Sequence, residues 1–251
     1  MELLLKIMGG ALGLLVPFLF AFAINKGINR SSFGIPASSS LKNQLIIFVF
    51  LWVVSVWALS ITNVLDYHQG DIFPRFVIAL FVPVNVGLLL LRNSIFKTIL
   101  NNIPVRTLVG IQTFRLAGIA FFLVVSNNLL PKPFVAAGYG DMITGSLALL
   151  AGLTLTRSTK VSRTLFWAFN LAGLLDLLNV AFMLLYYYPI WNNAQPSSAA
   201  ATQFSLVMIP AIAAPVALLL HIYSVRNYLL QSRISNEVPN AYIFADGKKT
   251  A

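Results

Sequence analysis

The chain has 251 residues, of which 58% are hydrophobic and only 10% are charged, and its mean hydropathy is +0.83. A soluble domain is usually about 25% charged, so the composition excludes an ordinary soluble protein and predicts an integral membrane protein. The formal net charge of +10 would suggest nucleic acid in a soluble protein. Here the basic residues lie in short gaps between apolar runs, so we expect no nucleic acid. The absence of cysteine excludes disulfides, a thiolate nucleophile and an iron–sulfur centre.

Seven segments are long and apolar enough to cross a bilayer, which requires ~20 mostly apolar residues. In chain order they lie near residues 3–24, 43–66, 73–92, 108–130, 134–156, 164–187 and 203–225. Proline, glycine and polar residues fill the gaps between them. We therefore predict an all-α integral membrane protein, with a seven-helix transmembrane domain over residues 1–230 and a polar cytoplasmic tail over residues 231–251.

The placement of lysine and arginine predicts the orientation. The gaps after the first, third and fifth segments, together with the tail, hold 13 basic residues, whereas the other gaps and the N-terminus hold 3. The excess of basic residues marks the cytoplasmic side, so the N-terminus is expected outside and the C-terminus in the cytoplasm of a cell membrane, the inner membrane if the source is bacterial.

The first segment has a rival interpretation as a signal peptide, because Ala21, Phe22 and Ala23 resemble a cleavage site. A signal peptide would enter with its N-terminus inside and would invert every later gap against the charge distribution. The first segment is therefore interpreted as a span.

Three ionisable residues lie inside the predicted spans: Arg115 in the fourth, Asp141 in the fifth and Asp176 in the sixth. A rise of ~1.5 Å per residue across ~30 Å places them ~18, ~10 and ~12 Å below the outer face. Because an arginine side chain reaches several ångströms, all three charged groups are expected to share one layer between the midplane and the outer face.

Each of these residues shares a helix face with glycine, since residues three or four apart lie on one side of a helix. The rows are Gln112, Arg115 and Gly118; Gly138, Asp141 and Gly145; and Gly173, Asp176 and Asn179. Small residues allow membrane helices to approach closely, so these faces are predicted to meet. The candidate intramembrane polar site therefore comprises Arg115, Asp141, Asp176, Gln112 and Asn179.

One arginine facing two carboxylates leaves an uneven charge, and two acids that share a cation usually differ in proton affinity. We expect one acid to pair with Arg115 and the other to be often protonated. Asp176 is closer in depth to Arg115 and is predicted to be the structural partner, which leaves Asp141 as the titratable group. Such a cluster is typical of a structural clamp or of a proton or substrate site.

The remaining polar features are weaker signals. Pro210 and Pro215 interrupt the seventh segment, and a proline either frees a carbonyl to line a cavity or kinks the helix. His221 is predicted near the cytoplasmic end as a surface or packing residue, so no histidine is expected near the acids. The only other histidine is His68, and the two are not spaced as metal ligands, so no metal or cofactor is expected. The seventh segment has no lysine for a retinal Schiff base.

Two of the spans contain the pattern AGxxD, at residues 137–141 and 172–176. Because these helices run in opposite directions, the pattern is compatible with an inverted repeat, although so short a match in an apolar background also arises by chance.

The stretches IQTFRLAG, AGYGDMITG, FNLAGLLDLLN and MIPAIAAPVALLLH resemble those of a group of uncharacterised small bacterial multi-pass membrane proteins. The resemblance covers roughly residues 105–225. It implies a membrane protein and brings no activity, ligand or site residue.

Three functions fit these features. The first is a small transporter or proton-coupled permeation protein that uses the polar site. The second is a membrane-embedded enzyme for a lipid or isoprenoid, with the acids in acid–base roles and the arginine on a phosphate, although no metal-binding DxxxD motif occurs. The third is a non-catalytic membrane scaffold. The expected partners are the lipid bilayer and a small-molecule, proton or lipid ligand.

Overall fold

The computed structural model describes the backbone of residues 2–156 and 159–245, and side chains within residues 6–156 and 159–232. This part of the chain is all-helical and contains no strand. In chain order the elements are α1 (Glu2–Arg30), α2 (Ile35–Ile61), α3 (Phe76–Leu90), α4 (Ser94–Asn101), α5 (Val105–Ile111), η1 (Gln112–Ile119), α6 (Ala120–Ser126), η2 (Lys132–Phe134), α7 (Val135–Thr154), α8 (Lys160–Tyr186), η3 (Ser198–Thr202), η4 (Ile209–Ala213) and α9 (Ala214–Ala245). The elements η1, η2 and η3 are 3₁₀ helices, and η4 is a π-helix.

Among the described residues, six helical segments are long and apolar enough to cross a membrane. The pair α3 and α4 would make a seventh if it is one span, although its two helices meet at 92°. These lengths and compositions are those of a membrane protein.

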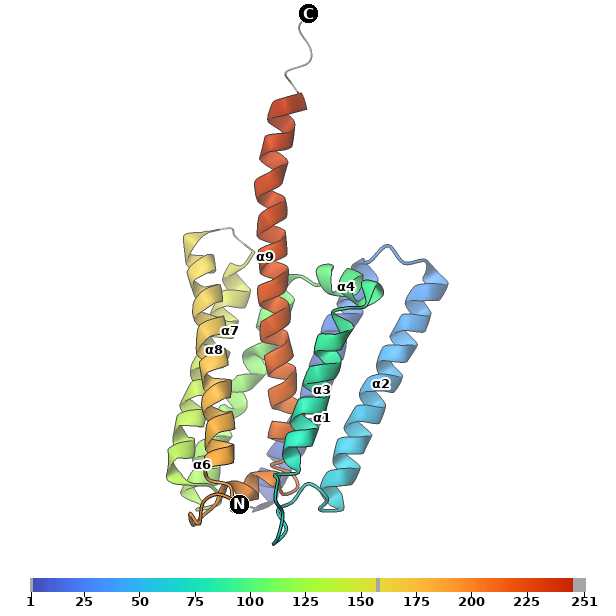
Figure 1. The fold of residues 1–251 in the computed structure, drawn as a ribbon. Coiled ribbons are helices and arrows are strands. Elements are labelled where there is room, and N and C mark those ends of the chain that lie inside the picture. Colours follow the sequence, from blue (N-terminus) through green and yellow to red (C-terminus); the bar gives the residue numbers. More distant parts are fainter. Residues whose placement is uncertain (1, 157–158, 246–251) are drawn as a thin grey trace, which may run out of the picture.

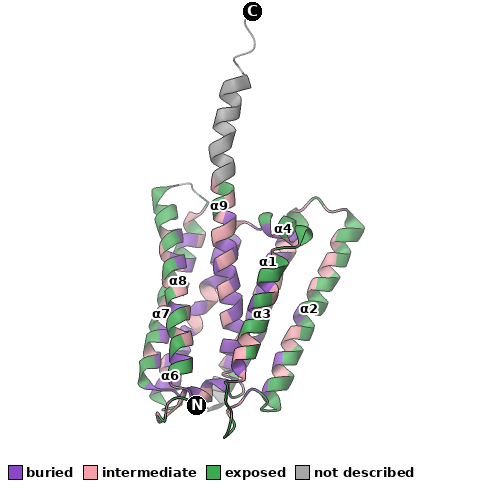
Figure 2. Ribbon diagram, in the orientation of Figure 1, coloured by how far each residue is buried: buried purple, intermediate pink, exposed green. Residues whose placement is uncertain are grey.

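The bundle is arranged around α9, which is the most buried of the long helices (Figure 2). The helices α1, α2 and α3 lie on one side of α9, and α6, α7 and α8 lie on the other (Figure 1). The helix α2 is at the periphery, where most of its side chains are exposed. Apolar side chains on that outer surface suit contact with lipid, because lipid tails are as apolar as leucine.

The sharp bend between α3 and α4 has a local cause at Asn93. This residue is extended, with a ψ of 128°, and its side chain accepts a hydrogen bond from the Phe96 backbone N–H at 3.0 Å. Asparagine at this position is a strong helix start, so a new helix begins in a new direction. Ile99 and Leu100 of α4 are buried and Lys97 is exposed, which makes α4 an amphipathic helix running across the bundle axis.

The fourth predicted span is helical but not uniformly α-helical, since η1 separates α5 from α6. Thr113 donates its hydroxyl to the Gly110 carbonyl at 2.7 Å. A side-chain bond to a carbonyl three residues back competes with the regular α-helical ladder, and bonds to the third residue define a 3₁₀ helix. Residues at i and i+3 then eclipse one another, so Gln112, Arg115 and Gly118 form one straight buried row.

The last long helix begins later and runs further than the segment predicted at 203–225. Residues 203–207 form a bend and turns, η4 contains Pro210, and α9 then continues to Ala245. Proline has no N–H to donate to an α-helical ladder, which accounts for the irregular turn at this point. The predicted tail over residues 231–251 thus begins within α9, and residues 246–251 lie outside the described part.

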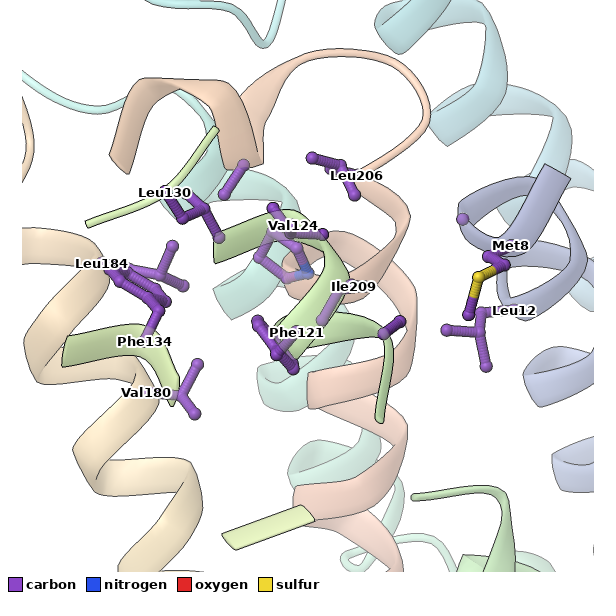
Figure 3. Close-up of a pocket in the computed structure, with 14 residues that line it drawn as sticks. Met8, Leu12, Phe121, Val124, Leu130, Phe134, Val180, Leu184, Leu206 and Ile209 are labelled. Carbon is purple, nitrogen blue, oxygen red and sulfur yellow. The ribbon is translucent and has the colours of Figure 1, made fainter. Parts of the chain in front are cut away.

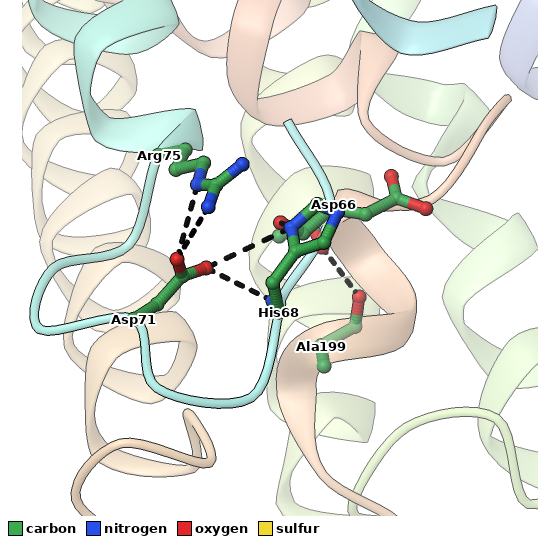
Figure 4. Close-up of polar contacts among 6 residues, drawn as sticks. Asp66, His68, Asp71, Arg75 and Ala199 are labelled. Carbon is green, nitrogen blue, oxygen red and sulfur yellow. Dashed lines mark hydrogen bonds and ion pairs between the residues drawn. The ribbon is translucent and has the colours of Figure 1, made fainter. Parts of the chain in front are cut away.

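The two ends of the bundle differ in charge. We call the end where α1 finishes, α4 lies and α8 begins the basic end (upper end in Figure 1). At the opposite end, the loop between α2 and α3 is organised by Asp71, which accepts hydrogen bonds from the Arg75 guanidinium at 2.6 Å and the His68 backbone N–H at 2.9 Å (Figure 4). The His68 N–H, followed by the Arg75 guanidinium, lowers the pKa of the Asp71 carboxyl below its usual value.

Candidate functional site: a buried arginine network

Arg115 joins two carboxylates from different helices. Its Nε donates to Asp141 Oδ1 of α7 at 2.6 Å, and its Nη2 donates to Asp176 Oδ2 of α8. The side chains of Arg115 and Asp176 are 2% and 4% exposed, whereas that of Asp141 is 19% exposed. The expected contact between Arg115 and the acids is present, and it includes both acids rather than one.

His221 completes the surroundings of the guanidinium. Its Nε2 lies 3.4 Å from Arg115 Nη1, which also lies 3.4 Å from the Gly173 carbonyl oxygen. The other ring nitrogen, Nδ1, lies 3.0 Å from Asn170 Oδ1. His221 is fully buried and stacks on Phe169, so it is a packing residue and not a surface residue, and the expectation that no histidine lies near the acids is wrong. Because the last helix starts later than predicted, His221 lies further inside the bundle.

The hydrogen bonds define the protonation of His221. Asn170 donates its amide nitrogen to the Phe166 carbonyl at 2.9 Å, so its Oδ1 faces His221 as an acceptor. The His221 Nδ1 must then carry the hydrogen, and Nε2 is left to accept from the arginine, since a neutral imidazole has one donor and one acceptor. A second ring proton would point at the guanidinium, so this geometry requires neutral imidazole.

We refer to Arg115, Asp141, Asp176, His221 and Asn170 as the arginine network. Ser224 extends it by donating its hydroxyl to Asn170 Oδ1 at 3.2 Å. The network joins η1, α7, α8 and α9, so it ties together four elements that are far apart in sequence. With one guanidinium, two carboxylates and a neutral imidazole, fully ionised side chains would carry one net negative charge.

Glycines allow these helices to come close enough for the contacts. A β-carbon at Gly118 would overlap the Asp141 side chain, and one at Gly140 would overlap Asp176 Oδ1. A β-carbon at Gly145 would lie 2.7 Å from the Leu116 backbone nitrogen. The prediction that glycine-bearing faces meet is therefore met on η1 and α7, because close helix approach requires small residues.

The other two predicted site residues, Gln112 and Asn179, differ in burial. Gln112 is fully buried, and neither its amide nitrogen nor its amide oxygen has a hydrogen-bond partner. Asn179 is exposed, and the structure does not bring it to the network, so its place in the predicted site is wrong. Three residues along a helix is a rotation of 300°, and the remaining 60° is enough to turn Asn179 outward.

Close to the network, two further buried polar atoms have no hydrogen-bond partner. Thr144 Oγ1 and Asp176 Oδ1 are both buried without a hydrogen bond. A buried polar group without a partner costs about 1–3 kcal/mol, and such groups in native proteins often mark bound water or a functional role. Gln112, Thr144 and Asp176 come from three adjacent elements, so the unpartnered atoms surround the same part of the bundle.

A small cavity of about 50 Å³ adjoins the network and is lined by Arg115, Asp141 and Asp176. Apolar and small side chains of α1, η1, α6, α8, η4 and α9 form the rest of its wall. A water molecule requires roughly 10–15 Å³ measured in this way, so the cavity has room for a few waters beside charged groups that would hydrogen-bond to them.

A second cavity of about 30 Å³, whose lining residues are drawn in Figure 3, lies next to the first. The two share lining residues, among them Leu12, Phe121 and Ile209. The second cavity is almost wholly apolar and extends to Leu130 and Leu206 near the loops. The two cavities therefore lie next to each other on the side of the network away from the basic end, with apolar side chains between them.

No group of three or more histidine, cysteine, aspartate or glutamate side chains in the described residues is arranged to hold a metal ion. The arginine network itself offers a guanidinium, two carboxylates and an imidazole, groups that can bind anions, exchange protons and donate or accept hydrogen bonds.

The fold and site define an all-helical membrane protein with a buried ion-pair network between its helices. The chain belongs to the family described as domain of unknown function DUF8737, whose model matches residues 75–229. This region runs from the start of α3 into α9, so it includes every residue of the arginine network. Neither the curated proteins nor the solved structures contain a match.

Proposed function

We propose that this chain is a small transporter of the cell membrane that couples permeation to protons through the arginine network. The observation that carries the proposal is the uneven charge of the network, with one guanidinium between two buried carboxylates. A net charge buried in low dielectric is unfavourable, and taking up one proton on a carboxylate removes it. Intramembrane ionisable residues are common in proton relays.

Asp141 is the carboxylate that we assign to proton exchange. Its side chain is the more exposed of the two acids, and it lines the cavity beside the network. Asp176 also lines this cavity, but its side chain is 4% exposed and its free oxygen faces Gly140. Asp176 then serves as the structural partner of Arg115, and a proton reaches or leaves Asp141 through water in the cavity.

Two irregular helices beside the cavity support the proposal that the site changes conformation during transport. Arg115 lies on the 3₁₀ helix η1, and Ile209 and Ala213 of the π-helix η4 line the same cavity. Mid-helix 3₁₀ segments often mark hinges, and π-bulges are frequent at functional sites. Changes in the winding of η1 or η4 would open a route through the apolar side chains between the two cavities.

The proposed orientation places the basic end in the cytoplasm and the N-terminus outside, as the excess of basic residues at that end favours. The chain has no cysteine, so single cysteines report the topology without background. Ser32→Cys, in the α1–α2 turn, is expected to react with a membrane-impermeant maleimide only from the cytoplasmic side. Asn193→Cys, between α8 and η3, is expected to react only from outside, and the reverse pattern would contradict this orientation.

Proton movement is tested in proteoliposomes that contain a pH-sensitive dye, with a potassium diffusion potential as the driving force. The wild-type protein is expected to carry protons faster than protein-free liposomes, and Asp141→Asn is expected to return the flux to that background. Asp71→Asn is the matched control, because it removes an arginine-paired carboxylate from a loop outside the spans. A flux that is unchanged in Asp141→Asn argues against the proposed role and in favour of a structural clamp.

A further inference from the structure

A pocket at the basic end gathers arginines from three separate parts of the chain. Arg30 comes from the end of α1, Arg106 from α5 and Arg163 from the first turns of α8, and all three line a pocket of about 540 Å³. Volumes of 300–1,000 Å³ are typical of small-molecule sites. The positive-inside rule explains basic residues in each gap, but it does not require three of them to line one concavity.

The pocket has positive charge without compensation from the described residues. Its lining contains no aspartate or glutamate. None of the three guanidinium groups forms a hydrogen bond or ion pair with another residue whose side chain the structure describes. Like charges that share a concave surface repel one another and attract an anion, so the pocket is suited to a negatively charged ligand.

The walls of the pocket are fixed by hydrogen bonds. On one side, Asn227 of α9 is buried and donates to the Leu100 and Ile103 carbonyls at 2.6 and 3.2 Å, which holds the loop after α4. On the other side, Thr159 and Ser162 form a reciprocal capping box at the start of α8. The backbone that carries the arginines is thus held in place before any ligand binds, which lowers the entropy lost on binding.

The position of the pocket indicates the level of the lipid headgroups. The amphipathic helix α4 lies at 92° to α3 and therefore runs across the bundle, as a helix does in the plane of a membrane interface. Asn101, the last residue of α4, is part of the pocket wall. This arrangement favours a depth near the phospholipid phosphates, and basic pockets at the cytoplasmic ends of spans are typical of sites for anionic headgroups.

We propose that the Arg30–Arg106–Arg163 pocket binds a phosphate-bearing anion, with the headgroup of an anionic phospholipid as the source that its depth favours. Guanidinium groups bind phosphate oxygens through paired, charge-assisted hydrogen bonds. The pocket is separate from the arginine network, and this binding does not depend on proton coupling.

The proposal is tested by thermal unfolding of the purified protein in a neutral detergent. One arm adds phosphatidylglycerol or phosphatidylcholine with the same acyl chains, and the other adds pyrophosphate or chloride at equal ionic strength. Phosphatidylglycerol is expected to raise the unfolding midpoint more than phosphatidylcholine does. If pyrophosphate alone reproduces the effect, the phosphate site stands and its ligand is soluble. If phosphatidylglycerol behaves as phosphatidylcholine and pyrophosphate behaves as chloride, the proposal is overturned.

Variants locate the effect. Arg106→Gln is expected to raise the half-saturating concentration of phosphatidylglycerol about fivefold, equivalent to ~1 kcal/mol for one basic side chain near a lipid surface. Arg92→Gln is the matched control, since it removes an exposed arginine of the same basic gap that does not line the pocket. If both variants weaken binding equally, the attraction is diffuse and the pocket is not the site. Arg163→Gln gives the same comparison if Arg106→Gln does not fold.

Discussion

Gly173 leaves the space that the imidazole of His221 occupies, because a β-carbon at residue 173 would overlap His221 Nε2. The Gly173 carbonyl and His221 Nε2 both lie 3.4 Å from Arg115 Nη1. One glycine therefore sets how closely α8 and α9 approach the arginine.

Gly173→Ala is expected to destabilise the protein by about 1–3 kcal/mol, because overpacking a close contact forces neighbouring side chains to move. The measurement is the thermal unfolding midpoint in detergent. Gly110→Ala is the control, since nothing lies within 4 Å of a β-carbon there, and alanine favours a helix over glycine by about 0.5–1 kcal/mol. A neutral result for Gly173→Ala would mean that His221 is not held as described.

The two acids of the network are expected to respond unequally to asparagine substitution. Asp176→Asn removes the less exposed of the two carboxylates that pair with the buried Arg115, and breaking a buried ion pair costs about 3–5 kcal/mol. Asp141→Asn is expected to cost less, because the Asp141 side chain is 19% exposed and asparagine is nearly isosteric with a protonated aspartate. Unfolding midpoints of both variants, with Arg115→Gln for comparison, decide the question. Equal large losses would favour a purely structural network.

If one carboxyl group of the network carries a proton, infrared spectroscopy is expected to detect it as a carboxylic acid. In the infrared spectrum of the wild-type protein, a carbonyl stretch of a protonated carboxyl group should be present near neutral pH and should shift in deuterium oxide. Asp141→Asn should remove this band, and Asp71→Asn should leave it in place. If the band persists in Asp141→Asn and disappears in Asp176→Asn, the roles assigned to the two acids are reversed.

His221 and Asn170 are expected to be energetically coupled. His221→Phe keeps an aromatic ring against Phe169, whose centroid lies 4.7 Å from that of the imidazole, but removes both ring nitrogens. In a double-mutant cycle with Asn170→Ala, the coupling should be about 0.5–3 kcal/mol, as for residues in one hydrogen-bond network. Pairing His221→Phe with Asn179→Ala gives the control, because Asn179 lies on α8, as Asn170 does, but is exposed. That pair should be additive within about 0.5 kcal/mol.

The stability of the folded protein is expected to depend on pH through Asp71, which lies in a loop outside the spans. The His68 backbone N–H and the Arg75 guanidinium lower its pKa from the usual value of 3.8. The folded protein therefore gains stability from ionised Asp71 above pH 3.8, and this gain is lost as the pH falls through the lowered pKa. The unfolding midpoint of Asp71→Asn should be below that of the wild type at pH 6, and the difference should narrow toward acidic pH. A difference that is constant with pH would mean that the carboxylate charge contributes nothing.

The sequence predicts the charged part of the site because charge within an apolar segment is expensive and must be paired. Arg115, Asp141 and Asp176 were identifiable for that reason, and their glycine neighbours indicated that the helices approach closely. Asn179 was misplaced because spacing along a helix does not specify which residues at the edge of a face turn outward. Whether the acids form a functional site stays a prediction.

His221 was missed because the start of the last helix was predicted too early. Residues 203–207 are apolar enough to extend a span, but they form a bend and turns before the π-helix at Pro210. Composition does not distinguish an apolar turn from an apolar helix, so the predicted depth of His221 was wrong. The bend at Asn93 had a usable signal, because asparagine followed by a new apolar run is a typical helix start.

The 3₁₀ winding of η1 gives the fourth span a mechanical property. Eight residues rise ~16 Å in a 3₁₀ helix and ~12 Å in an α-helix. Rewinding η1 would therefore shorten this span by ~4 Å and turn Arg115 by ~60° relative to Gly118. The same side chains would then face different neighbours. The direction in which Arg115 points therefore depends on the number of residues per turn in η1.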